Sequence, residues 1–133
     1  TSPLWVGGAV SHGPQPRSYE FKLPRKVKRQ ALLGALSSRR AQEGLVVVDE
    51  FKLDRPSTRS MKDLLARVGL PAGTKVLFLY SSDEQLACMS ARNIAGVSCL
   101  RVDGVNVYDL LNHSHVLISK GTLEALQQRL QGE

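Results

Sequence analysis

Four strand-sized apolar runs, separated by segments of helical periodicity, constrain the fold of this 133-residue chain more than any other feature. The runs are residues 45–49, 76–80, 97–102 and 115–119. The first is a nearly continuous apolar stretch bounded by Gly44 and charged side chains, which is typical of a strand buried on both faces. Strands joined by helices imply right-handed crossovers and a parallel sheet covered on both sides. The sequence therefore predicts one α/β domain with a mainly parallel four-stranded sheet flanked by helices.

Short polar motifs predict where the helices between these strands begin. A serine or asparagine followed three residues later by an acidic or amide side chain is the pattern of a helix N-terminus, and it occurs at Ser60, Ser82 and Asn106. Apolar residues at helical spacing follow the first two of these motifs, as expected for helices with one buried face. The predicted helices are residues 60–69, 82–93, 106–112 and 122–131.

The net charge of the chain lies in its first third. Residues 1–44 hold eight Lys and Arg against two Asp and Glu, whereas residues 45–133 hold ten of each, so the net charge of +6 belongs to residues 1–44. Residues 1–24 are rich in Gly and Pro and contain no apolar stretch long enough for a packed element. We predict an extended basic N-terminal arm over residues 1–24 and a globular domain over residues 25–133. A cationic arm on a neutral body indicates an anionic partner, and nucleic acid is the leading candidate.

The helix predicted after the arm begins with clustered cations. Pro24 fits the first position of a helix that runs to about Glu43, and Arg39 and Arg40 add the same sign near its far end. Cations in the first turns face the positive end of the helix dipole, where each costs about 0.3–1 kcal/mol, whereas bound phosphate would remove that cost and accept hydrogen bonds from free N–H groups. A solvated charge run without a function is the alternative. The cations at the helix start are Arg25, Lys26, Lys28 and Arg29.

Polar side chains at the ends of the predicted strands raise the alternative of a catalytic site. Acids, hydroxyls and a lysine at the carboxyl ends of parallel strands can hold Mg²⁺ and a phosphoryl group, as in a receiver-like domain. The same residue types favour turns and helix starts for backbone reasons, and we take that as their role. No glycine-rich phosphate-binding motif follows any strand. The residues concerned are Asp49, Glu50, Ser81, Ser82, Asp83, Asp103, Ser119 and Lys120.

Histidines and cysteines provide only weak candidates for metal or redox chemistry. The spacing of His113 and His115 would place both rings on one face of a strand, but the sequence supplies no third ligand. Cys88 and Cys99 form no CxxC motif, which favours two reduced, mostly buried thiols. We therefore predict no metal, no cofactor, no catalytic residue and no enzymatic activity. No apolar run reaches the length of a membrane span.

Three segments together resemble one known family. Residues 10–29 read VSHGPQPRSYEFKLPRKVKR, residues 90–97 read SARNIAGV and residues 104–112 read GVNVYDLLN. In this order they closely resemble the bacterial-type fourth protein of the large ribosomal subunit, a universal family with an exit-tunnel loop. The resemblance implies an α/β structural protein that binds large-subunit RNA early in assembly. It also implies that the family's N-terminal part and most of its basic loop are absent here, so the tunnel contact is not carried over.

The arm and the helix start carry most of the RNA contacts that we expect. Donors and a stackable ring in residues 11–19 suit irregular RNA, and for Tyr19 a plain packing role is the alternative to base stacking. The resemblance adds Arg92 and Asn93 near a helix end, where a capping or surface role is the alternative. Family members often have an aromatic residue in place of His12. The predicted RNA-binding residues are His12, Gly13, Pro14, Gln15, Arg17, Ser18, Tyr19, Lys22, Arg25, Lys26, Lys28, Arg29, Arg92 and Asn93.

The function that we expect is that of a structural constituent of the large ribosomal subunit, which binds ribosomal RNA and supports subunit assembly. Its partners would be large-subunit RNA and neighbouring ribosomal proteins, with no membrane and no small-molecule substrate. Its location would be the cytoplasmic ribosome, and an organellar ribosome stays open. The alternatives are a free-standing RNA-binding regulator of translation or transcription and a receiver-like phosphoryl-handling domain.

Overall fold

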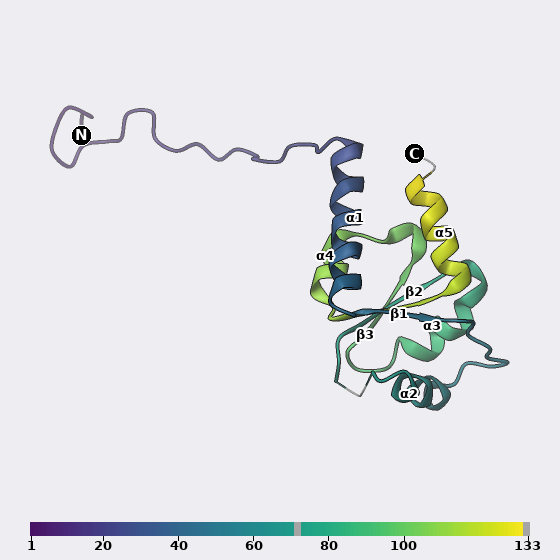
Figure 1. Ribbon diagram of the computed structural model, residues 1–133. Helices are drawn as coiled ribbons and strands as arrows, with labels where there is room; N and C mark the ends of the chain where they lie inside the picture. The colour runs from purple at the N-terminus through teal and green to yellow at the C-terminus, as the bar shows by residue number, and fades with distance from the viewer. Residues whose placement is uncertain (71–72, 132–133) are drawn as a thin grey trace.

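Four parallel strands in the order β1-β4-β2-β3 form the centre of the structure, a computed structural model that describes residues 1–70 and 73–131 (Figure 1). Every neighbouring pair is parallel, which confirms the predicted sheet. All four strands begin at the predicted residues, and β1 and β3 each end one residue early. The strands are β1 (Leu45–Val48), β2 (Val76–Tyr80), β3 (Val97–Arg101) and β4 (His115–Ser119).

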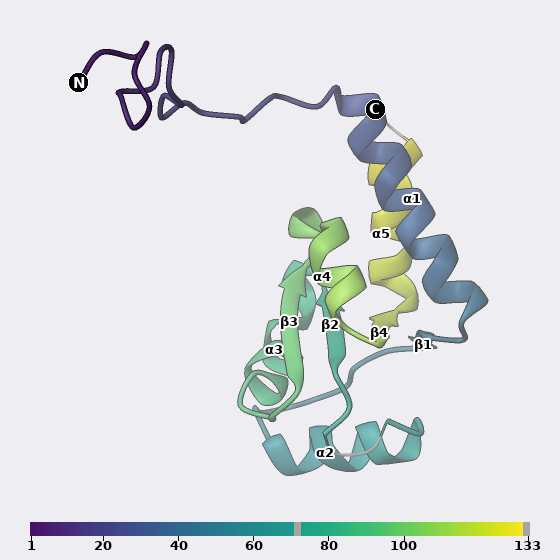
Figure 2. The ribbon, with the colours of Figure 1, turned by 90° about the vertical axis from the view of Figure 1, so that its left-hand side faces the viewer.

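Helices cover both faces of the sheet (Figure 2). Apolar residues of α1, α4 and α5 pack on one face, and those of α2 and α3 pack on the other. The two connections that lead from β1 towards β3 use the second face and the returning connection uses the first, so all three crossovers have the same hand. The helices are α1 (Arg25–Ala41), α2 (Thr58–Arg67), α3 (Gln85–Ala91), α4 (Val107–Asn112) and α5 (Lys120–Gln131), with 3₁₀ turns η1 (Ser82–Glu84) and η2 (Val102–Gly104).

The central strand β2 shows why this sequence forms a two-sided sheet. Leu77 and Leu79 belong to the cluster beneath α1, α4 and α5, whereas Val76 and Phe78 belong to the cluster beneath α2 and α3. Each of these four side chains is at most 2% exposed. Side chains that alternate between two packed faces explain a continuous apolar run instead of an apolar–polar alternation.

Two of the three helix starts that were predicted from short polar motifs are displaced, Ser60 by three residues and Ser82 by one, and α5 begins at Lys120 instead of Thr122. The start of α2 is capped by Ser57, whose Oγ accepts from the Ser60 backbone N–H at 3.3 Å, so Ser60 lies inside the helix. The turn before α3 starts at Ser81, where the Glu84 carboxylate accepts from the Ser81 N–H at 3.2 Å. In both cases a second serine just upstream is extended and can cap, which Ser60 and Ser82 cannot do inside the turn. The start at Asn106 is confirmed, because its Oδ1 accepts from the Asp109 N–H at 2.8 Å.

Residues 1–24 contain no helix or strand and leave the body beside the first turn of α1 (Figure 1). Backbone hydrogen bonds from Trp5 to Ser2 and from Ala9 to Thr1 close a small loop at the tip. The division into an arm over residues 1–24 and a domain over residues 25–133 stays a prediction, and residues 71–72 and 132–133 of that domain lie outside the described residues.

Candidate nucleic-acid interface

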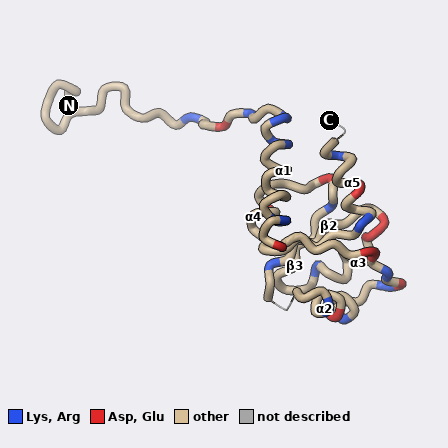
Figure 3. Tube along the Cα trace, viewed as in Figure 1, with Lys and Arg blue, Asp and Glu red and all other residues tan. Residues whose placement is uncertain are grey.

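The first turns of α1 are cationic and extend beyond the sheet. Leu32 and Ala35 in the middle of α1 are buried in the core, whereas the preceding turns rise beyond the edge of the sheet (Figures 1 and 2). The first turn contains no acidic residue, and Pro24 supplies no side-chain cap. Figure 3 shows Lys and Arg gathered there and at the adjoining end of the arm. The predicted cations Arg25, Lys26, Lys28 and Arg29 therefore lie together at an uncapped helix N-terminus.

Arg39 holds the C-terminal end of α1 against α4. In the sequence it looks like one more member of the basic run in this helix. Arg39 Nε donates to the Leu110 carbonyl at 2.8 Å, and its Nη2 donates to the Leu111 carbonyl at 3.0 Å. Its Nη1 donates to Gln42 Oε1 at 2.8 Å. Arg39 thus satisfies the last carbonyls of α4 and holds α1 in place, while Arg40 is exposed.

The predicted arm residues are displayed to solvent rather than packed on the body. All the arm residues predicted to bind RNA are exposed except Gly13, which is half-buried. The Arg17 guanidinium lies 4.5 Å from the centre of the Tyr19 ring, and Tyr19 is 76% exposed. Ser18 Oγ accepts from the Glu20 N–H at 3.2 Å. Tyr19 contacts Arg17 and is not buried against the body, so base stacking and local packing both stay open for it. The other exposed arm residues are His12, Pro14, Gln15 and Lys22.

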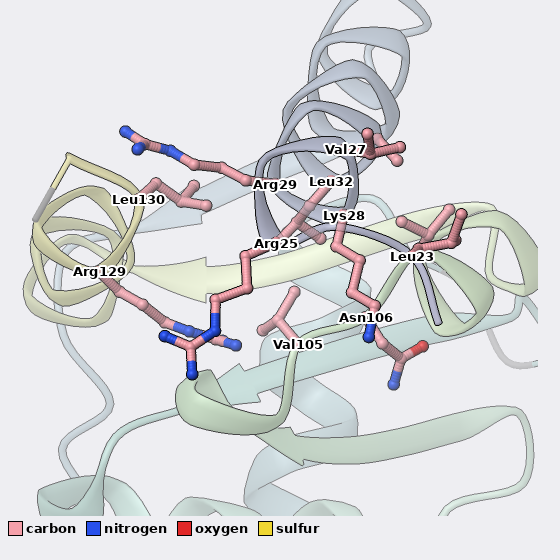
Figure 4. A pocket seen from close by; sticks show the side chains of 12 residues that line it. Leu23, Arg25, Val27, Lys28, Arg29, Leu32, Val105, Asn106, Arg129 and Leu130 are labelled. Carbon is pink, nitrogen blue, oxygen red and sulfur yellow. The ribbon is translucent and has the colours of Figure 1, made fainter. Parts of the chain in front are cut away.

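A groove of about 550 Å³ lies between the start of α1, the end of α5 and the turn that leads into α4 (Figure 4). We call it the α1–α5 groove. Its floor is aliphatic: Leu32 and Val105 are buried, whereas Leu23 and Val27 are each 46% exposed. Ala31 and Leu130 complete this part of the lining. An aliphatic hollow beside a cationic turn is not visible in the sequence, because it forms where α5 meets α1.

Cations surround the α1–α5 groove, and one of them was not predicted. Arg25 and Lys28 reach down from α1 towards the turn before α4, and Arg129 reaches the same turn from α5 (Figure 4). Arg129 Nη1 donates to the Val102 carbonyl at 2.6 Å, which fixes its guanidinium near that turn. None of the described residues that line the groove is acidic. A lone arginine in the last helical turn gives no sequence signal beyond a favourable interaction with the helix dipole, so Arg129 was missed.

Arg92 and Asn93 lie apart from the other predicted residues. They follow α3, which packs on the face of the sheet opposite α1. Both are exposed, and the Arg92 backbone N–H donates to the Cys88 carbonyl at 3.0 Å at the end of the helix. The structure therefore gives these two residues a separate surface, where RNA contact and a capping role both stay open.

The acids at the strand ends are engaged with neighbouring cations. Asp49 forms an ion pair with Lys120, whose hydrogen bond and charge lower the pKa of the Asp49 carboxyl below its ordinary value. Arg101 Nη2 lies 2.9 Å from the Asp103 carboxylate. Glu50 pairs with Lys52 at 3.1 Å. These are exposed surface pairs.

A hydroxyl network fills the crevice between the carboxyl ends of β2 and β4, where helices leave on opposite faces. Thr122 Oγ1 donates to the Glu84 carboxylate at 2.7 Å, and Ser119 Oγ accepts from the Thr122 N–H at 3.1 Å. Ser119 and Thr122 are at most 2% exposed. Ser119 thus caps the turn that follows its strand, which is the role predicted for it, whereas the bond between Thr122 and Glu84 was not predicted.

His113 and the cysteines have structural partners. His113 follows α4 and precedes β4, which begins at His115 as predicted, so the two rings do not share a strand face. Its Nδ1 lies 2.8 Å from the Asp109 carbonyl and must donate, and its Nε2 lies 2.8 Å from the Ser98 hydroxyl. Cys99 is free and half-buried, and burial followed by the neighbouring Cys88 raises its pKa to about 12. Within residues 1–70 and 73–131, no group of three metal-binding side chains occurs.

Comparison with known proteins points to a single family. Residues 1–129 match the Ribosomal protein L4/L1 family. The chain is 44% identical to the large ribosomal subunit protein uL4 of Moorella thermoacetica, over 97% of this chain and 61% of that protein. It is 42% identical to the uL4 of Alkaliphilus metalliredigens, over 96% of this chain and 60% of that protein. The chain thus spans about three fifths of the length of these curated relatives. No helix in the described ranges is both long and apolar enough to cross a membrane.

Proposed function

Because the chain belongs to the ribosomal protein L4/L1 family, we propose that it is a structural constituent of the large ribosomal subunit that binds large-subunit ribosomal RNA. Its further partners are neighbouring ribosomal proteins, and its location is the ribosome of the cytoplasm or of an organelle. The names of its relatives support the ribosomal role. The pairing of the strand-end acids supports a role without catalysis, so Asp49→Ala and Asp103→Ala should leave RNA binding unchanged.

The observation that carries the RNA-binding part is the uncapped cationic start of α1. Arg25 and Lys28 form no ion pair within the described residues, and no acid occupies the first turn to offset the helix dipole. Like charges at that end destabilise the free protein, whereas RNA phosphates reverse the sign of the interaction. The exposed arm adds Arg17 and Lys22 along the same path. The neutral body orients the cations and is not itself required to bind strongly.

Removal of these cations tests the proposal. The triple substitution of Arg25, Lys28 and Arg29 to Gln should weaken binding to large-subunit RNA at physiological salt by on the order of a hundredfold. The matched control replaces the exposed Arg59, Lys62 and Arg67 of α2 by Gln, which removes the same charge from the other face.

Two results decide the proposal. Affinity should fall for the α1 variant and change less than threefold or so for the α2 variant, because long-range attraction is screened at this salt. Equal loss in both variants would mean that only net charge matters. The protein without substitutions should also co-sediment with large ribosomal subunits, whereas a free-standing regulator would not.

A further inference from the structure

The α1–α5 groove combines positive charge with an aliphatic lining. A site that binds only phosphate needs the charge but not the aliphatic lining. Arg25, Lys28 and Arg129 supply positive charge, whereas the aliphatic lining includes Val105, between Arg25 and Lys28, and Leu23 and Val27, beyond Lys28 (Figure 4). A monomeric protein gains by covering such side chains, yet Leu23 and Val27 remain 46% exposed. The floor therefore indicates an occupant with an apolar part as well as negative charge.

Paired RNA does not fit this description. The outer surface of an RNA duplex presents phosphates and sugars, and its bases are stacked inside. Only an unpaired nucleotide places a flat, weakly polar base next to its own phosphates. The volume of about 550 Å³ lies within the range of pockets that enclose small molecules.

The size of the groove also disfavours a protein occupant. Twelve residues line it, whereas a stable protein–protein interface involves about 20–30 residues on each side. The groove is continuous with the proposed RNA path, because Leu23 and Arg25 belong both to its lining and to the junction of arm and helix. RNA that follows the arm must pass its mouth.

We propose that the α1–α5 groove binds one unpaired nucleotide of the RNA, which deepens the proposed function and rests on it. The base packs on the aliphatic floor formed by Leu23, Val27 and Ala31. The flanking phosphates contact Arg25, Lys28 and Arg129. The hydrogen bond from Arg129 to the Val102 carbonyl holds its guanidinium at the turn and leaves its other N–H groups for phosphate. Asn106 does not read the base, since its amide already bonds Gly104 and Asp109.

The described lining residues offer no polar side chain that could recognise one base, and this predicts which RNA feature the groove selects. No aromatic ring and no uncommitted amide lies among the described lining residues. The groove should therefore discriminate only weakly between the four bases. It should select instead for a nucleotide that is unpaired and unstacked. Recognition of this kind selects a position in a folded RNA by its shape.

Filling the groove separates this proposal from simple charge attraction. Ala31 lines the groove but is exposed, so Ala31→Trp should fill the hollow without disturbing the core. The control, Ser37→Trp, adds the same ring to an exposed position of α1 outside the groove. We expect Ala31→Trp to weaken binding to a large-subunit RNA transcript by about tenfold, or about 1.4 kcal/mol, with its salt dependence unchanged. Ser37→Trp should bind like the original protein.

Photo-crosslinking identifies the occupant directly. With p-benzoylphenylalanine at position 31, crosslinks to the transcript should map to a single loop or bulge, and the same group at position 37 should not mark that site. Crosslinks confined to base-paired RNA, crosslinks to a neighbouring protein in assembled subunits, or unchanged affinity of Ala31→Trp would each overturn the groove proposal. Unchanged RNA affinity of the triple variant of Arg25, Lys28 and Arg29 would instead overturn the proposed function, so the two failures are distinguishable.

Discussion

Arg39 is expected to be the cation on α1 with the largest effect on stability. Its guanidinium donates to the Leu110 and Leu111 carbonyls at 2.8 and 3.0 Å, and these carbonyls end α4 without another helical partner. A hydrogen bond that involves a charged group contributes about 1.5–3 kcal/mol when buried. Because one of these bonds is partly buried and the other is exposed, we discount each to about 1–1.5 kcal/mol and expect Arg39→Met to lower the free energy of unfolding by about 2–3 kcal/mol in total.

Arg40→Met is the matched control. It removes the same charge one position along the helix from a side chain that is exposed and has no hydrogen bond or ion pair among the described residues. Exposed substitutions of this kind change stability by no more than about 0.5 kcal/mol. Thermal unfolding followed by circular dichroism should then show a melting temperature lower by roughly 6–12 °C for Arg39→Met and nearly unchanged for Arg40→Met.

Equal melting temperatures for Arg39→Met and Arg40→Met would refute the stabilising role that we assign to Arg39. Equal destabilisation would mean that the general charge of α1, rather than the bonds to α4, determines stability. Unchanged melting of Arg39→Met would mean that water satisfies the α4 carbonyls equally well. Because Arg39 holds α1 in position, its loss should also weaken RNA binding. The effect should be smaller than that of removing the cations at the helix start.

Three further outcomes are expected. Gly34→Ala should raise the free energy of unfolding by about 0.5–1 kcal/mol in urea denaturation, because Gly34 lies inside α1 and an added Cβ meets nothing within 4 Å. Gly96→Ala should lower it by about 1–3 kcal/mol in the same assay, since Gly96 has a φ of +85° and an added Cβ would lie 2.8 Å from the Thr74 carbonyl oxygen. In a Cys88→Ser background, which removes the neighbouring thiol but keeps Cys99 half-buried, Cys99 should still react with iodoacetamide at pH 8 more slowly in the folded than in the denatured protein, because burial is the largest cause of its raised pKa and leaves less thiolate. Equal rates would contradict the burial of this thiol.

Local sequence signals predicted the sheet well because each strand is marked by its own residues. The first residues of β1, β2, β3 and β4 were predicted correctly, since Gly and charged side chains bound short apolar runs. Helix starts were less certain where two candidate caps stand close together. Ser57 and Ser60 both suit a helix start, and only the extended backbone at Ser57 decides between them.

The candidate site was predicted only in the part that is continuous in sequence. The charge of Arg25, Lys26, Lys28 and Arg29 is visible as a run of letters, and their common location at a helix start follows from Pro24. The α1–α5 groove brings Arg129 and Leu130 of α5 close to α1 residues that precede them by more than 90 positions, and no local pattern encodes it. Arg39 shows the converse, because a cation of the same run serves α4 through contacts that only the fold reveals.

The salt dependence of RNA binding tests the central claim most directly. The logarithm of affinity falls with the logarithm of salt concentration by about 0.7–0.9 for each phosphate contacted. Replacing Arg25, Lys28 and Arg29 by Gln should therefore flatten the measured slope by about two to three units. An unchanged slope in this variant, with large-subunit RNA still bound, would show that the start of α1 does not contact phosphate and would contradict the account.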